Sequence, residues 1–214
     1  NLLLYFLNRP IQRSKSCFIA LILLFGGCQD EQPSQVKLDS VLKTHFSLIQ
    51  NKQLGAARVR LRQHMDNHAE SSDALFLMGL SYHQDKQYSK AVDWFKKGVS
   101  TELDDIYPPT WHFLGWSYFN LGQIQKSKDA FTQHLMLHPD EEDSLFGLGL
   151  IAIEEGNLIE AKQMFLQSMQ QSKLESVTQA KATARCGDVS AELGNWQDAI
   201  SLYEKAVTLN PDLY

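Results

Sequence analysis

Histidine pairs are the residues in this 214-residue chain whose type and spacing most directly suggest chemistry. His64 and His68 are four residues apart, and so are His134 and His138. Imidazoles at positions i and i+4 lie on one face of a helix, where two of them can bind a transition metal. Neither pair carries the glutamate of a helical metalloprotease motif, and the sequence indicates no third ligand. We therefore interpret both pairs as structural, and we expect no metal and no other cofactor.

Signatures of catalysis are missing from the sequence. Gly147-Leu148-Gly149 does not follow a strand pattern, so it does not predict a phosphate-binding loop, and no nucleophile lies in a recognisable elbow motif. The acidic runs at 104–105 and 141–143 stand where helices are expected to begin, and carboxylates are favourable at helix N-termini. We interpret these runs as helix caps and predict that the chain is not an enzyme.

Cys28 follows a segment with the layout of a signal peptide. Three basic residues precede an unbroken apolar run at 18–25, which is too short to span a bilayer as a stable helix. The basic residues are Arg9, Arg13 and Lys15. Two glycines then stand directly before Cys28. This arrangement resembles the bacterial lipobox, with Phe25 at the position where leucine is usual.

The lipobox resemblance implies cleavage after residue 27 and acyl chains, such as palmitate, on Cys28. Residues 1–27 would then be a lipoprotein-type signal peptide and 28–37 a polar, flexible tether. Two or three acyl chains hold a protein firmly on a membrane. Gln29 favours the outer membrane of a Gram-negative bacterium, and the predicted localisation is the periplasmic side. An uncleaved signal anchor and ordinary cleavage that leaves a free cysteine are the two alternatives.

The charge balance excludes some classes of partner. The whole chain has a formal charge of -5, and loss of residues 1–27 leaves 17 basic and 25 acidic residues, a formal charge of -8. An acidic protein is a poor ligand for nucleic acid and for anionic lipid headgroups. We expect attachment to the membrane through the lipid alone, and neither a nucleic acid nor a small-molecule substrate.

Large and small apolar residues recur along the chain with a period near 34. In the unit that begins at Pro108 they occupy positions 4, 7, 8, 11, 15, 24 and 32, which are Trp111, Leu114, Gly115, Tyr118, Gly122, Phe131 and Pro139. This spacing resembles the tetratricopeptide (TPR) repeat, a helix–turn–helix unit. The resemblance implies an all-α solenoid with a right-handed superhelix. Gly115 would let the partner helix approach closely, and Gly122 would end the first helix.

Five such units are predicted. They comprise a degenerate repeat at 38–71 and repeats at 72–107, 108–141, 142–179 and 180–214. Two departures from the family pattern are Ser127, where alanine is usual, and Ala152, where the preceding units have tyrosine. The sequence around Pro211 is typical of a repeat boundary, so we expect the natural protein to continue past Tyr214.

The TPR resemblance also implies a binding groove on the concave face, lined by the first helix of each unit. The predicted groove residues, which are apolar except for one histidine, are Phe46, Phe76, Leu80, His112, Trp116, Phe119, Phe146, Leu150 and Ile153. A contiguous apolar stripe on a surface typically marks a partner site. The Lys and Asn pattern of a carboxylate clamp is absent, which favours an amphipathic helix or an apolar peptide segment as ligand. The alternative is that the protein's own side chains cover several of these residues.

The sequence therefore predicts a membrane-tethered TPR scaffold that binds protein partners, with assembly of a pilus, secretion or cell-wall complex as its expected role. One alternative is an inner-membrane, signal-anchored periplasmic factor for chaperone function or cytochrome biogenesis. Another is a recruitment domain of an enzyme whose catalytic part lies beyond residue 214.

Overall fold

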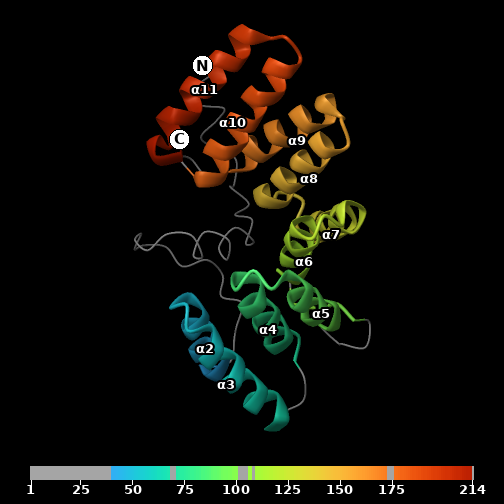
Figure 1. The fold of residues 1–214 in the computed structure, drawn as a ribbon, viewed down its shortest axis with the longest axis vertical. Coiled ribbons are helices and arrows are strands. Elements are labelled where there is room, and N and C mark those ends of the chain that lie inside the picture. Colours follow the sequence, from blue (N-terminus) through green and yellow to red (C-terminus); the bar gives the residue numbers. More distant parts are fainter. Residues whose placement is uncertain (1–39, 68–70, 101–105, 108, 173–175, 214) are drawn as a thin grey trace, which may run out of the picture.

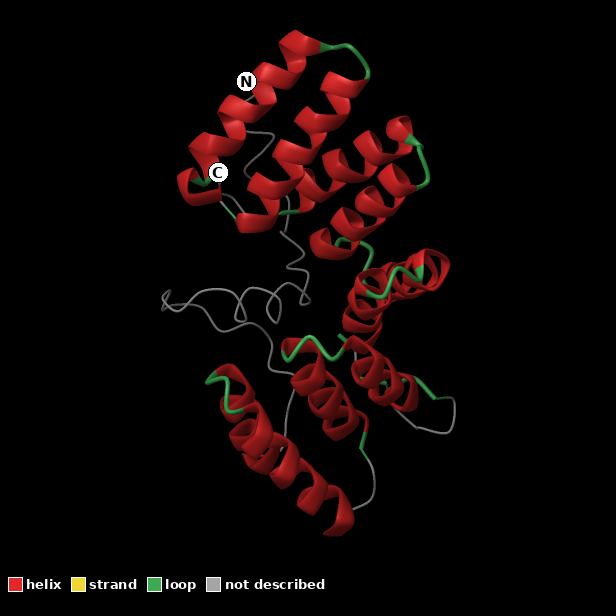
Figure 2. Ribbon diagram, in the orientation of Figure 1, coloured by secondary structure: helices red, strands yellow, loops and turns green. Residues whose placement is uncertain are grey.

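The structure is a computed structural model that describes residues 40–67, 71–100, 106–107, 109–172 and 176–213. All regular elements within these ranges are helices, and the same ranges contain no strand (Figure 2). The all-α prediction is confirmed. The predicted signal peptide, lipidation site and tether at 1–37 lie outside the described residues.

Ten α-helices and one short 3-10 helix make up the described part of the chain. In order they are α2 (Ser40–Gln50), α3 (Leu54–Asn67), α4 (Ser72–Gln84), α5 (Tyr88–Gly98), α6 (Thr110–Asn120), α7 (Ile124–Leu137), α8 (Glu142–Glu154), α9 (Leu158–Gln171), α10 (Val177–Glu192), α11 (Trp196–Leu209) and η1 (Pro211–Leu213). None of the helices in this part of the chain has the length and apolar content needed to cross a bilayer.

The helices stack as consecutive pairs along one curved array, from α2–α3 at one end to α10–α11 at the other (Figure 1). Each even-numbered helix packs against the odd-numbered helix that follows it. Each even-numbered helix also contacts the next even-numbered helix, for example α6 with α8. The even-numbered helices are therefore the first helices of the repeating pairs, and they form a continuous layer through the array.

The turn inside every pair is built on one residue with a left-handed backbone. Gly122, Gly156 and Gly194 have φ values of +68°, +77° and +79°, and Lys52 and Lys86 have φ values of +60° and +57°. All five occupy position 15 of their units. Glycine adopts this conformation without a steric penalty from Cβ, whereas lysine does so at a cost. The helix-ending role predicted for Gly122 is confirmed.

Close approach of the two helices in a pair depends on a glycine that faces an aromatic ring. A Cβ built on Gly79, Gly115 or Gly149 would lie 2.4–2.7 Å from the ring of the aromatic residue 16 positions later. These rings are Phe95, Phe131 and Phe165, all of them fully buried. Gly187 and Tyr203 have the same relationship, with a closest distance of 2.8 Å. The close packing predicted at Gly115 is therefore confirmed.

The first pair, α2–α3, departs from this rule. His45 stands at the glycine position and is buried, and Leu61 replaces the aromatic ring and is also buried. A larger residue on one helix is thus matched by a smaller one on the other, which keeps the helices packed without the glycine. This exchange explains why the repeat pattern is weak at 38–71.

Two further departures from the repeat pattern have a local explanation. Ser127 is fully buried and donates a hydrogen bond from Oγ to the carbonyl oxygen of Gly115 at 2.9 Å, so its hydroxyl is satisfied where other units have alanine. Ala152 is buried in the cluster formed by α8, α9 and α10. Cys186 belongs to the same cluster and is a free, buried thiol whose pKa is raised by burial, which makes it a core residue.

Candidate functional site

Exposure divides the nine predicted groove residues into two groups. Five are partly exposed: Phe46, Trp116, Phe119, Leu150 and Ile153. Four are buried, with 0–8% of their surface exposed: Phe76, Leu80, His112 and Phe146. The expectation that all nine line an open groove is wrong for the second group.

The protein's own aromatic side chains cover the buried members. Phe76 stacks on Tyr107 with ring centroids 4.6 Å apart and contacts Phe113 edge-on at 5.6 Å. Tyr107 belongs to the two residues inserted before the third unit, so the insertion supplies the cover. Phe146 packs against Phe165 at 5.5 Å. Burial of these rings stabilises the fold and leaves them unable to contact a partner directly.

Four of the five partly exposed groove residues lie on the neighbouring first helices α6 and α8. Trp116 packs edge-on against Phe131 and Phe119, with centroid distances of 5.2 and 5.8 Å, and lies 6.3 Å from Phe146. Trp116 therefore contacts buried rings on one side and is partly accessible to solvent. Leu150 and Ile153 on α8 are partly buried and pack against the buried cluster formed by α8, α9 and α10. We call Trp116, Phe119, Leu150 and Ile153 the α6–α8 patch.

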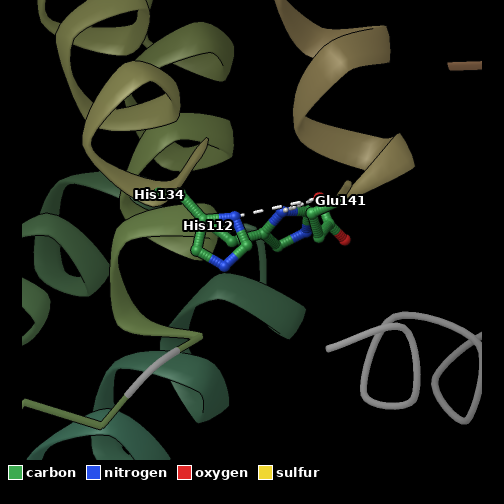
Figure 3. Close-up of side chains that lie close together, drawn as sticks. All are labelled: His112, His134 and Glu141. Atoms are coloured by element: carbon green, nitrogen blue, oxygen red, sulfur yellow. Dashed lines mark ion pairs between the residues drawn. The ribbon is translucent and has the colours of Figure 1, made fainter. Parts of the chain in front are cut away.

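A buried polar cluster lies where the third and fourth pairs meet. His112 lies on α6, His134 lies on α7, and Glu141 is the N-cap residue of α8. Their side chains point toward one another (Figure 3). Their exposed fractions are 4%, 3% and 3%. Candidate ligand atoms of the three residues lie within 4.8 Å of one another, and the residues that the structure describes contain no other such group.

Ser144, in the first turn of α8, is the centre of this cluster. Its Oγ lies 3.1 Å from Nδ1 of His112 and 2.9 Å from Nδ1 of His134. Its backbone N–H donates to Oε2 of Glu141 at 2.7 Å, which confirms the capping role predicted for this acidic run. Because a hydroxyl has one proton to donate, at least one of the two imidazoles must donate its own Nδ1 proton to Ser144.

Opposite charges set the protonation of the cluster. Burial alone would lower the pKa of His112, but the charge of Glu141 and its hydrogen bond raise it. Burial would raise the pKa of Glu141, yet His112, at 3.6 Å, and His134 lower it to about 2. Burial and the nearby His112 lower the pKa of His134 to about 3. The cluster at neutral pH therefore contains a carboxylate, an imidazole favoured in its charged form and a neutral imidazole.

The neighbours of His134 in the structure differ from those that the i, i+4 spacing of the histidine pairs suggests. The rings of His134 and His138 are 5.1 Å apart, as i and i+4 residues are, but the side chains that converge with His134 are His112 and Glu141. The sequence indicates no third ligand, and the structure places two candidate ligands beside His134. No spacing rule connects residues 112, 134 and 141, because they come from three separate segments. His68 lies outside the described residues.

Models of the tetratricopeptide repeat match three segments of the chain. One matches residues 72–105 and 108–141, and a second matches residues 180–213. Among curated proteins, "Tetratricopeptide repeat protein 8" of Caenorhabditis elegans is 29% identical over 96 residues, which cover 44% of this chain. The "Peroxisomal targeting signal receptor" of Candida albicans is 30% identical over 134 residues, which cover 62% of this chain. The matches span only 19% and 22% of these relatives' own lengths.

Solved structures with a similar fold have low sequence identity to this chain. MamA aligns with a TM-score of 0.68 at 18% identity, over 83% of this chain and 98% of MamA. PilF of Pseudomonas aeruginosa aligns with a TM-score of 0.71 at 15% identity, over 80% of this chain and 76% of that one. YrrB, described as a TPR protein with an unusual peptide-binding site, aligns with a TM-score of 0.63 at 20% identity, over 81% and 86%. The described part of this chain is thus an all-α solenoid of repeating helix pairs, and three of its segments match models of the tetratricopeptide repeat.

Proposed function

We propose that the chain is an adaptor that binds an apolar or amphipathic peptide segment of a partner protein on the α6–α8 patch. The observation that carries this proposal is the incomplete burial of Trp116, Phe119, Leu150 and Ile153, although four other predicted groove residues are covered. Trp116 packs edge-on against the buried ring of Phe131 and is partly exposed, and tryptophan is among the residue types most enriched at binding hot spots.

Charge supports an apolar ligand over an acidic one. The described first helices of the third and fourth pairs, α6 and α8, carry no lysine or arginine, and the chain as a whole is acidic. A partner carboxylate would find no lysine or arginine on these helices, and the imidazole of His112 on α6 is buried. Two similar proteins also support peptide recognition by this type of fold. One is described as a targeting signal receptor and the other as a protein with a peptide-binding site.

Selection of peptides from a random library against the purified chain tests the proposal. We expect the selected peptides to carry apolar residues at helical spacing. Phe119→Glu is the informative variant, because Phe119 contacts Trp116 but does not belong to the buried hydrophobic core. It should weaken peptide affinity by about tenfold or more, as expected at a hot spot, with an unchanged melting temperature.

Met136→Glu provides the matched control. Met136 lies on α7, the second helix of the same pair, and is 68% exposed, so the variant adds the same charge to the same unit outside the patch. Its peptide affinity should equal that of the parent chain. Equal loss of affinity in both variants, or no loss in either, would place the binding surface elsewhere.

We propose further that acyl chains on Cys28 tether this adaptor to the periplasmic side of a bacterial membrane, with the outer membrane favoured, where it assists assembly of an envelope complex. The basic, apolar and small-residue segments before Cys28 support this proposal. The intact mass of the protein expressed in a Gram-negative host, compared with Cys28→Ala, provides the test. A mass that corresponds to residues 28–214 plus acyl chains is expected, and an unmodified chain that retains residues 1–27 would contradict the tether.

A further inference from the structure

The cluster of His112, His134 and Glu141 combines residue types that the fold itself does not require. The unit position of His112 is occupied by Phe76 in the second unit and by Phe146 in the fourth. The position of His134 is occupied by Gly98 and Ser168 in the same units. Both neighbouring units place an apolar ring and a small residue at these positions and bury them, so a helix junction of this type forms without two buried imidazoles.

Buried polar groups in place of apolar ones have a cost. Removal of a carboxylate and two imidazoles from water is unfavourable unless each finds a partner. Here the three side chains are at least 94% buried and all converge on Ser144. The arrangement thus concentrates donor atoms at one point instead of distributing them along the interface.

The geometry of that point is close to a coordination sphere. Oε2 of Glu141 lies 3.6 Å from Nδ1 of His112 and 3.8 Å from Nδ1 of His134. Ligands bound to a tetrahedral metal at 2.0–2.1 Å are about 3.3–3.4 Å apart, so these two distances need to contract by only a few tenths of an ångström. Ser144 Oγ, about equidistant from both imidazoles, lies within reach of a fourth position.

We propose that Nδ1 of His112, Nδ1 of His134 and Oε2 of Glu141 bind a divalent transition-metal ion, with Zn²⁺ as the best match. Two imidazole nitrogens and one carboxylate oxygen suit zinc, whereas Ca²⁺ and Mg²⁺ prefer sites made entirely of oxygen. The Nδ1 proton that an imidazole donates to Ser144 leaves when the metal binds, and the metal replaces that hydrogen bond. Glu142 and Asp143 add negative charge beside His112, which favours a cation there.

The role of this ion is structural. The ligands come from α6, α7 and the start of α8, so the ion connects the third pair of helices to the fourth. Their burial leaves no open face for a substrate. An ion at this junction stabilises the relative orientation of the helices that carry the α6–α8 patch. The metal-site proposal does not depend on whether that patch binds a peptide.

Isothermal titration calorimetry tests the site. The full chain is first treated with EDTA and is then titrated with ZnCl₂. We expect saturable binding of one ion and a melting temperature that rises with the Zn²⁺ concentration, since a ligand that binds the native state stabilises it by mass action. Co²⁺ should give the intense visible absorption of a four-coordinate ion. MgCl₂ and CaCl₂ should give neither signal. Absence of saturable Zn²⁺ binding would overturn the proposal.

His112→Phe and His134→Ser place in the third unit the residues that the fourth unit already uses at these positions, so both variants are expected to fold. Each should weaken Zn²⁺ binding by at least about tenfold and abolish the Co²⁺ absorption band. His138→Gln is the matched control, because it removes the i+4 neighbour of His134 and leaves the cluster intact. Zn²⁺ binding that is lost in His138→Gln and retained in His112→Phe would refute this assignment in favour of the i, i+4 pair of His134 and His138.

Discussion

Gly115 and Phe131 are in direct van der Waals contact across the third helix pair. A Cβ on Gly115 would lie 2.7 Å from both Cδ1 and Cε1 of the Phe131 ring. Gly147 of the next pair approaches the other edge of the same ring, where a Cβ would lie 2.6 Å from Cε2. One fully buried phenylalanine thus determines the spacing both within the third pair and between the third and fourth pairs.

Gly115→Ala should destabilise the protein by about 1–3 kcal/mol, because the new methyl group overpacks the contact with Phe131. Phe131→Leu in the same chain should recover part of that loss, since the first pair packs with Leu61 at this position. Urea unfolding of the two single variants and the double variant measures the coupling. Strictly additive losses would show that the two residues do not interact.

Lys86→Gly should stabilise the protein by about 1 kcal/mol, because Lys86 has a left-handed backbone that glycine adopts without strain. Gly122→Ala, the reverse change at the same unit position, should destabilise it by about 1–2 kcal/mol. Space around Gly122 is open, so any loss in this variant comes from the backbone and not from a clash. Thermal unfolding midpoints that shift in the same direction for both variants would contradict this explanation.

His83 should make the protein less stable in acid. Burial and then the charge of His112 lower the pKa of His83 to about 4, below its ordinary value of 6.5. The unfolded chain takes up a proton below pH 6.5, whereas the native state does so only near pH 4, so the free energy of unfolding falls as the pH drops across this window.

His83→Asn should reduce this pH dependence. An asparagine keeps a polar atom near Ser117 Oγ, which lies 2.9 Å from Nδ1 of His83, but it does not titrate. Urea unfolding at pH 6.5 and at pH 4 should show a smaller loss of stability in the variant than in the parent chain. An identical loss in both would mean that His83 does not contribute.

Lys128→Ala should cost less than about 1 kcal/mol, although Lys128 and Glu155 form a 2.7 Å ion pair between α7 and the end of α8. Their side chains are 33% and 28% exposed, so water and salt screen the attraction. Phe165→Ala, which removes a fully buried ring, should cost about 3–5 kcal/mol and provides the comparison. A loss for Lys128→Ala comparable to that of Phe165→Ala in urea unfolding would refute this ranking.

Local features of the fold could be predicted from the sequence because they depend on short-range geometry. The helix boundaries follow from the spacing of apolar residues, and the turn after α6 follows from Gly122. The contact between Gly115 and Phe131 follows from the 16-residue separation of the two positions within one hairpin. A period of about 34 residues and the apolar positions inside it therefore determined the solenoid.

Only the tertiary structure decided which side chains remain accessible and which polar groups meet. Phe76 is covered because the inserted Tyr107 stacks on it, whereas Trp116 on the next first helix stays partly exposed. His112, His134 and Glu141 converge only when the third and fourth pairs are placed against each other. The physical reason is that periodicity specifies each helix and its hairpin partner. The orientation of one pair on the next depends on the side-chain volumes and the inserted residues at the junction. The spacing of residues within a repeat does not specify them.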